Sequence, residues 1–151
     1  MQWLTLVVLT LVVLAPSAPA FADQSYHSTH APLLTAGGAV TQGSVVNIHP
    51  NGPVLGAIER YHIVGATPNT SYCVYWEVVG FGIIPSGLDF AHPFQLTTNT
   101  AGNATGQLQI PRSFQLANGF TDTTITVRWL IRNCATNELA FRTEFAAVHL
   151  D

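Results

Sequence analysis

The sequence predicts an all-β fold, an antiparallel β-sandwich of seven strands, and three observations support this prediction. Short runs rich in Val, Ile, Thr and aromatic residues recur after residue 42, clusters of Gly, Pro, Asn and Asp separate them, and no stretch shows helical spacing. Strands at this spacing over about 100 residues are typical of a sandwich. The expected strands cover residues 43–49, 56–64, 71–79, 92–98, 105–110, 123–132 and 139–149.

The first three strands are recognised by their β-branched and aromatic content. They read GSVVNIH, GAIERYHIV and SYCVYWEVV. The third alternates between two faces, which indicates a strand with one buried side. Its inner face is expected to hold Tyr72, Val74, Trp76 and Val78, and its outer face Cys73, Tyr75 and Glu77.

The sequence predicts two turns among the last four strands. The fourth and fifth, HPFQLTT and TGQLQI, are joined by Asn- and Gly-containing sequence that predicts a hairpin turn at 101–103. The sixth, TTITVRWLIR, has the clearest alternation, and residues 133–138 predict a second hairpin leading into the seventh, LAFRTEFAAVH. The expected core is Val45, Tyr61, Val74, Trp76, Phe94, Leu96, Leu108, Ile110, Val127, Trp129, Phe141 and Phe145.

Residues 1–22 have the pattern of a secretory signal peptide. They carry no charged side chain, contain an apolar run from Trp3 to Ala15, and end in the small-x-small triplet Ala20-Phe21-Ala22. We expect cleavage after Ala22, with Ala18-Pro19-Ala20 as a second acceptable site and an uncleaved interfacial anchor as the alternative. Residues 23–42 lack sustained periodicity and are expected to form a flexible arm ahead of the domain at 43–151.

The charge balance excludes one class of partner and indicates a compartment. Only 9% of the 151 residues are charged, against about 25% in typical soluble domains, and the net charge is −3. The five basic residues are scattered arginines, whereas a nucleic-acid surface needs clustered cations. The expected mature chain is therefore secreted or periplasmic, with no nucleic-acid partner and no membrane span.

The two cysteines support export. Cys73 and Cys134 both lie in the expected mature chain, and an even pair in an exported protein is first interpreted as a disulfide. Strand alternation points both sulfurs away from the core, and if the third and sixth strands are neighbours, the bridge joins them near the 133–138 hairpin. Two sequons, at Asn69 and Asn103, matter only in a host that glycosylates.

The stretch Val64-Gly65-Ala66-Thr67-Pro68-Asn69-Thr70-Ser71-Tyr72-Cys73-Val74 resembles the apolar-x-x-Pro-x-Thr-x-Tyr-x-Val segment of fibronectin type III domains. In that family a Pro-bearing turn leads into a strand whose Tyr locks a corner. The resemblance implies an immunoglobulin-like sandwich architecture and nothing about activity. Phe94-x-Leu96-Thr97 with Gly102 and Leu108 is similar to hairpins of secreted bacterial immunoglobulin-like modules.

Residues for common catalytic chemistry are sparse. No Gly-x-Ser-x-Gly motif occurs, and Ser44, Ser86 and Ser113 lie in turn-like contexts. A glycosidase needs two carboxylates opposed across a cleft, and exposed strand faces explain the acidic residues equally well. These residues are Glu59, Glu77, Asp89, Glu138 and Glu144. We expect no cofactor.

Six histidines leave metal binding open. His27 and His30 are the first candidate ligands, because a flexible arm would bring both to one ion. No His-x-His, His-Glu-x-x-His or Cys-His cluster supports them, and isolated histidines on a polar face are usually only solvated.

The segment 80–91, GFGIIPSGLDFA, is the candidate contact surface. It is long for a hairpin loop and contains one charged residue. It either caps the core or forms an exposed patch for adhesion or self-association, through Phe81, Ile83, Ile84, Leu88 and Phe90. The sequence therefore predicts an exported non-catalytic module that binds a protein or glycan or assembles at the cell surface. The alternative is a His-based metal-binding protein or metal-dependent enzyme.

Overall fold

The computed structural model describes residues 27–50, 52–120 and 122–150, which form an all-β antiparallel fold with one short helix. The expected signal peptide and its cleavage site lie outside the described residues. The elements are β1 (His27–Thr35), β2 (Val40–His49), β3 (Leu55–Ile63), β4 (Ser71–Val78), β5 (Gly82–Pro85), β6 (Phe94–Thr97), β7 (Ala104–Pro111), α1 (Arg112–Ala117), β8 (Thr123–Asn133), β9 (Leu139–Arg142) and β10 (Ala146–Leu150).

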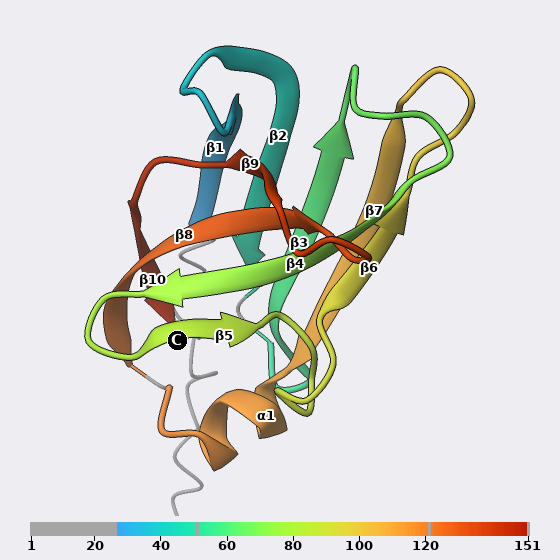
Figure 1. Ribbon diagram of the computed structural model, residues 1–151. Helices are drawn as coiled ribbons and strands as arrows, with labels where there is room; N and C mark the ends of the chain where they lie inside the picture. The colour runs from blue at the N-terminus through green and yellow to red at the C-terminus, as the bar shows by residue number, and fades with distance from the viewer. Residues whose placement is uncertain (1–26, 51, 121, 151) are drawn as a thin grey trace, which may run out of the picture.

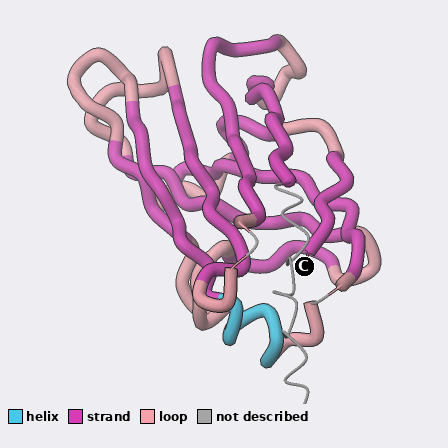
Figure 2. Tube along the Cα trace, turned by 180° about the vertical axis from the view of Figure 1, so that it is seen from behind, coloured by secondary structure: helices cyan, strands magenta, loops and turns pink. Residues whose placement is uncertain are grey.

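The strands form one strongly curled sheet. Its order is β5-β4-β8-β9-β1-β2-β3-β7, with β6 paired to β4 and β10 paired to β8. In Figure 1, β4, β5 and β8 run across the front of the view, and β1, β2, β3 and β7 run steeply behind them. The sheet therefore folds over itself into two layers, and α1 lies at one end of the space between them (Figures 1 and 2).

The described residues form ten strands where seven were expected, for three reasons. Residues 27–35 form β1, residues 82–85 form β5, and the expected strand 139–149 is divided into β9 and β10. The division occurs at Thr143, which is fully buried: its hydroxyl accepts a hydrogen bond from the Trp129 backbone N–H and donates to the Glu144 carbonyl. The immunoglobulin-like seven-strand arrangement is not confirmed.

The expectation of a flexible arm at 23–42 is wrong for its described part. β1 is an internal strand, paired with β2 on one side and with β9 on the other. Residues Ala31, Leu33 and Leu34 are buried, so this segment contributes to the folded domain and not to a mobile extension. The helix α1 was also not expected, because six residues are too few to show a helical period.

The core lies between the two layers and agrees closely with the sequence-based expectation. Of the expected core residues, all except Phe94 and Phe145 are buried. Phe94 is partly buried and stacks on Tyr61, with ring centroids 5.3 Å apart. Phe145 is wrong as a core residue: it lies on the exposed side of the sheet, where the Arg128 guanidinium sits 4.6 Å above its ring centroid.

One predicted hairpin is present and the other is only a turn. The segment 133–138 joins the paired strands β8 and β9, with Asn133 N–H donating to the Glu138 carbonyl. The turn at 101–103 also forms, and the Asn99 side chain accepts hydrogen bonds from the N–H groups of Ala101 and Asn103. However, β6 pairs with β4 and β7 with β3, so this turn carries the chain from one layer to the other.

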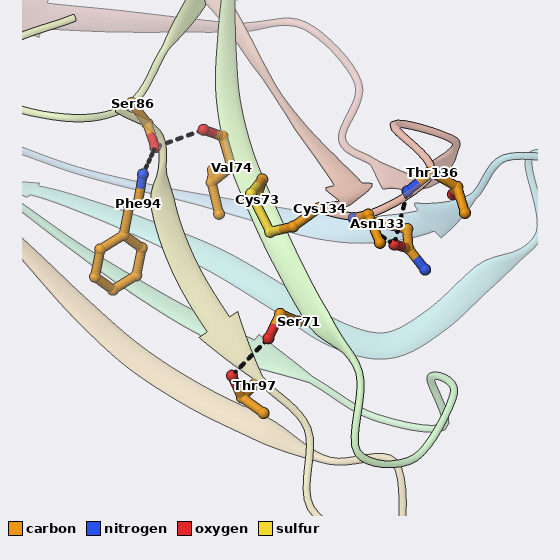
Figure 3. Close-up of a disulfide and its surroundings, with 10 residues drawn as sticks. Ser71, Cys73, Val74, Ser86, Phe94, Thr97, Asn133, Cys134 and Thr136 are labelled. Atoms are coloured by element: carbon orange, nitrogen blue, oxygen red, sulfur yellow. Dashed lines mark hydrogen bonds between the residues drawn. A yellow bond between two sulfur atoms is a disulfide. The ribbon is translucent and has the colours of Figure 1, made fainter. Parts of the chain in front are cut away.

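The disulfide between Cys73 and Cys134 is confirmed (Figure 3). β4 and β8 are neighbours, and Cys73 lies opposite Arg132 on β8. Cys134 follows β8 directly, and its N–H donates to the Ser71 carbonyl. Cys73 itself is buried but is not part of the core cluster, as expected for the outer face of β4.

The tyrosine corner implied by the fibronectin type III resemblance is present as local geometry. The Tyr72 hydroxyl accepts a hydrogen bond from the Thr67 N–H, five residues earlier, at 3.2 Å. The Tyr72 ring is buried and packs against Phe141. This contact fixes the direction in which the chain enters β4.

Candidate functional site

A buried carboxylate lies between the two layers of the sheet. β3 alternates between inward and outward side chains, and Ala57, Glu59, Tyr61 and Ile63 are the inward, buried set. An acidic residue therefore occupies a core position of a central strand. Its cross-strand partner on β2 is Asn47, which is also buried.

Four side chains donate hydrogen bonds to Glu59. Asn47 Nδ2 lies 3.1 Å from Oε1, and the Tyr61 hydroxyl donates to Oε2. Two more donors come from the opposite layer, where Trp76 of β4 and Trp129 of β8 are themselves cross-strand partners. Trp76 Nε1 is within 3.1 Å of both carboxylate oxygens, and Trp129 Nε1 is 2.9 Å from Oε1. These indole hydrogen bonds connect the two layers through the core.

Burial governs the protonation of this cluster. Loss of solvation raises the pKa of Glu59 above its ordinary 4.5, against the opposing effect of its four hydrogen-bond donors. Burial, with the adjacent Glu59 charge as the next cause, raises the pKa of the Tyr61 hydroxyl well above 10. Tyr61 therefore stays neutral, and Glu59 retains its proton to a higher pH than an exposed glutamate.

We expect Glu59 to make stability fall as the pH rises. Because its pKa is higher in the folded than in the unfolded chain, its stabilising contribution is complete below the unfolded value near 4.5 and is lost as the pH rises through the folded value. Glu59→Gln has no titrating group at this position. In urea melts, the difference in free energy of unfolding between the wild type and Glu59→Gln should therefore shift against the wild type as the pH rises. A shift in favour of the wild type would contradict this assignment.

Beside Glu59 lies a small pocket of about 60 Å³. Its walls come from both layers and from α1, and most are apolar or aromatic. Its lining comprises Asn47, His49, Ala57, Glu59, Trp76, Val78, Phe90, Ile110, Phe114, Gln115, Phe120, Ile125, Val127, Trp129, Val148 and Leu150. A concave, mostly apolar site with a few polar groups is the usual form of a small-molecule site.

Two polar atoms in the pocket wall have no partner among the described residues. They are the side-chain oxygens of Asn47 and Gln115, and both residues are at least nine-tenths buried. Gln115 is carried by α1, and its carboxamide lies against Gly56 of β3. A Cβ at Gly56 would come within 1.8 Å of Gln115 Oε1, so only glycine permits this contact. A buried hydrogen-bond acceptor without a donor is costly, so these two oxygens are places where water or a ligand could donate a hydrogen bond.

The segment 80–91 is divided between the pocket and the surface. Phe90, at a positive φ of 53°, turns inward, and its ring packs against Phe114 with centroids 4.9 Å apart. Ile84 on β5 also packs against the core. Phe81, Ile83 and Leu88 are exposed. Part of this segment therefore caps the core, and the exposed Phe81 contacts Phe120.

The turn that delivers Phe90 is held by an acidic side chain. Asp89 Oδ1 accepts hydrogen bonds from the N–H groups of Ala91 and His92, and Oδ2 lies 2.9 Å from His92 Nδ1. The His92 side-chain hydrogen bond, followed by the backbone ones, lowers the pKa of Asp89 to about 2. The turn therefore keeps its ionised carboxylate well into the acidic range.

Substitutions to Ser should separate the two parts of this segment. Phe81→Ser should change the free energy of unfolding by less than about 1 kcal/mol, because the ring is 65% exposed. Ile84→Ser should cost about 2 kcal/mol or more, because it removes packing from the core and buries a hydroxyl. Denaturant melts measure both values, and equal costs would contradict the division.

The structure does not bring the candidate metal ligands together. His27 and His30 are three residues apart on β1, so their side chains point to opposite faces of the sheet. His27 instead packs edge-on against His149. Among the described residues, no group of three or more His, Cys, Asp and Glu side chains is placed to hold a metal ion.

Ser86, one of the serines in a turn-like context, has a structural role. It is fully buried, and its hydroxyl donates to the Val74 carbonyl at 2.8 Å and accepts from the Phe94 N–H (Figure 3). Glu77 is partly buried and forms an ion pair with Arg128 on the neighbouring strand β8.

Sequence reasoning missed the principal site residues. Glu59 was grouped with acidic residues of exposed strand faces, which is wrong. The available signal was its parity with Tyr61, an expected core residue two positions away, because alternate residues of a strand share a face. Asn47 shares its face with Val45 in the same way. For Gln115 the sequence offered no comparable signal.

The chain matches no protein-family model, and no curated protein or solved structure matches it. Within the part of the chain that the structure describes, no helix has the length and apolar character needed to cross a bilayer.

Proposed function

We propose that this chain is an exported binding protein that holds a small, largely apolar molecule in the pocket beside Glu59. One observation supports this most strongly: apolar and aromatic side chains enclose a pocket whose wall carries two buried, unpaired acceptors, Asn47 and Gln115. A core selected only for stability would pair or exclude these atoms. The pocket replaces the exposed part of segment 80–91 as the principal binding site in this proposal.

Binding fits this arrangement better than acid–base catalysis. Each oxygen of Glu59 accepts hydrogen bonds from at least two donors, and these donors are buried side chains of the fold. A general base needs a free lone pair directed at its substrate. Glu59 is better suited to fix Asn47 and the two indoles as walls of the pocket than to transfer protons.

The proposal also includes export of the chain and a relationship to immunoglobulin-like domains. The Cys73–Cys134 disulfide favours an oxidising compartment outside the cytoplasm, which agrees with the charge-free, apolar sequence of residues 1–22. A relationship to fibronectin type III or immunoglobulin-like domains rests on the stretch 64–74 and the Tyr72 corner. Contact with a protein or glycan, or self-association, would use the exposed Phe81, Ile83 and Leu88.

Nuclear magnetic resonance of the indole N–H groups tests the proposed pocket. Four-carbon probes of different head group (n-butanol, n-butylammonium and n-butyrate) are titrated into the full chain. At least one should shift the Trp76 and Trp129 Nε1–H signals saturably, because both rings line the pocket.

Substitutions that fill the pocket test whether the probes bind inside it. Ala57→Leu adds three carbons at a lining position and should weaken binding at least tenfold, and Val148→Ile fills it more gently if the first variant unfolds. Ala147→Leu makes the same change as Ala57→Leu at an exposed position of β10 and should bind normally. Binding that survives both filling variants would place it elsewhere and overturn the proposal.

A further inference from the structure

The unpaired atoms of the pocket specify what the ligand must offer. Both are carbonyl oxygens, one from Asn47 and one from Gln115, so both accept hydrogen bonds and neither can donate. Asn47 is oriented by its own Nδ2, which donates to Glu59 and so assigns the other atom of the amide as the unpaired oxygen. A ligand group that donates hydrogen bonds therefore complements this wall, and a carboxylate does not.

The surroundings of these acceptors favour a positive charge. None of the residues that line the pocket is a Lys or an Arg, and His49 is its one basic side chain. Aromatic rings form much of the wall, and ring faces attract cations. The five rings are Trp76, Phe90, Phe114, Phe120 and Trp129.

The size of the pocket restricts the group further. The pocket measures about 60 Å³, so only a small head group reaches its polar wall. A quaternary ammonium is bulkier than a primary one and has no N–H to donate. A primary ammonium is compact and carries three N–H donors, whereas an alcohol carries only one O–H.

We propose that the pocket recognises the primary ammonium group of a small alkylamine, with Asn47 and Gln115 accepting its hydrogen bonds. This inference rests on the proposed binding function and specifies its ligand class. The alkyl chain of the ligand would follow the apolar wall formed by residues such as Val78 and Val148.

The three four-carbon probes test this directly at constant ionic strength. n-Butylammonium should bind at least tenfold more tightly than n-butanol, and n-butyrate should bind more weakly than either. Gln115→Met removes one acceptor while keeping a side chain of similar length, so n-butylammonium should lose at least tenfold in affinity and n-butanol less. Gln109→Met makes the same substitution at an exposed position of β7 and should change neither affinity.

The outcomes separate the two proposals. Suppose that n-butanol or n-butyrate binds as tightly as n-butylammonium and that Ala57→Leu blocks this binding. The proposed pocket is then supported, and the assignment of an ammonium ligand is overturned. The assignment also falls if Gln115→Met, shown to be folded by its indole spectrum, binds n-butylammonium unchanged. If no probe shifts the Trp76 and Trp129 signals, both proposals are overturned.

Discussion

Glu59→Ala is expected to destabilise the protein by about 4 kcal/mol or more. The substitution leaves four buried donors, on Asn47, Tyr61, Trp76 and Trp129, without their acceptor. Each unpaired buried donor costs about 1–3 kcal/mol, and the space vacated by the carboxyl group adds a cavity. Only part of this sum will be realised, because water and side-chain rotation relieve some of it. Guanidinium unfolding followed by tryptophan fluorescence measures the loss.

Two variants show whether the hydrogen-bond acceptor is responsible. Glu59→Gln keeps an oxygen where Asn47 and the two indoles converge, and its amide nitrogen can donate to the Tyr61 oxygen. It should therefore lose no more than about 1 kcal/mol near neutral pH. Glu144→Ala removes a carboxylate whose side chain is 71% exposed and should cost less than about 1 kcal/mol. A cost for Glu59→Ala as small as that of Glu144→Ala would mean that Glu59 does not connect the layers.

The all-β class and most of the core were predictable because alternation is a local property. The face split of residues 71–79 and 123–132 correctly placed Trp76 and Trp129 inside. Pairing between strands is not local: a period of two shows which residues share a face but not which strand lies alongside. This is why the internal position of β1, between β2 and β9, could not be foreseen.

The candidate site depends both on alternation within a strand and on the packing of distant segments against each other. The burial of Glu59 follows from strand parity, but its hydrogen bonds to Trp76 and Trp129 require the two layers to face each other at that height. Gln115 depends on a helix of six residues, and on Gly56 leaving room for its carboxamide. These contacts join different segments, up to 70 positions apart, so no pattern within a single segment could reveal them.

Removing the disulfide is the second substitution from which we expect a large effect. The Cys73–Cys134 bridge spans 61 positions and closes a loop that includes β5, β6, β7, α1 and β8. In the chain-entropy model, such a loop constrains the unfolded state by about 4 kcal/mol. The Cys73→Ala/Cys134→Ala variant should lose about this much in free energy of unfolding and show a steeper denaturant dependence, because its unfolded chain exposes more surface. Thiol titration of the denatured, unreduced wild type should find no free cysteine. Two reactive thiols, or a loss below about 1 kcal/mol, would mean that the bridge does not form or does not constrain the chain.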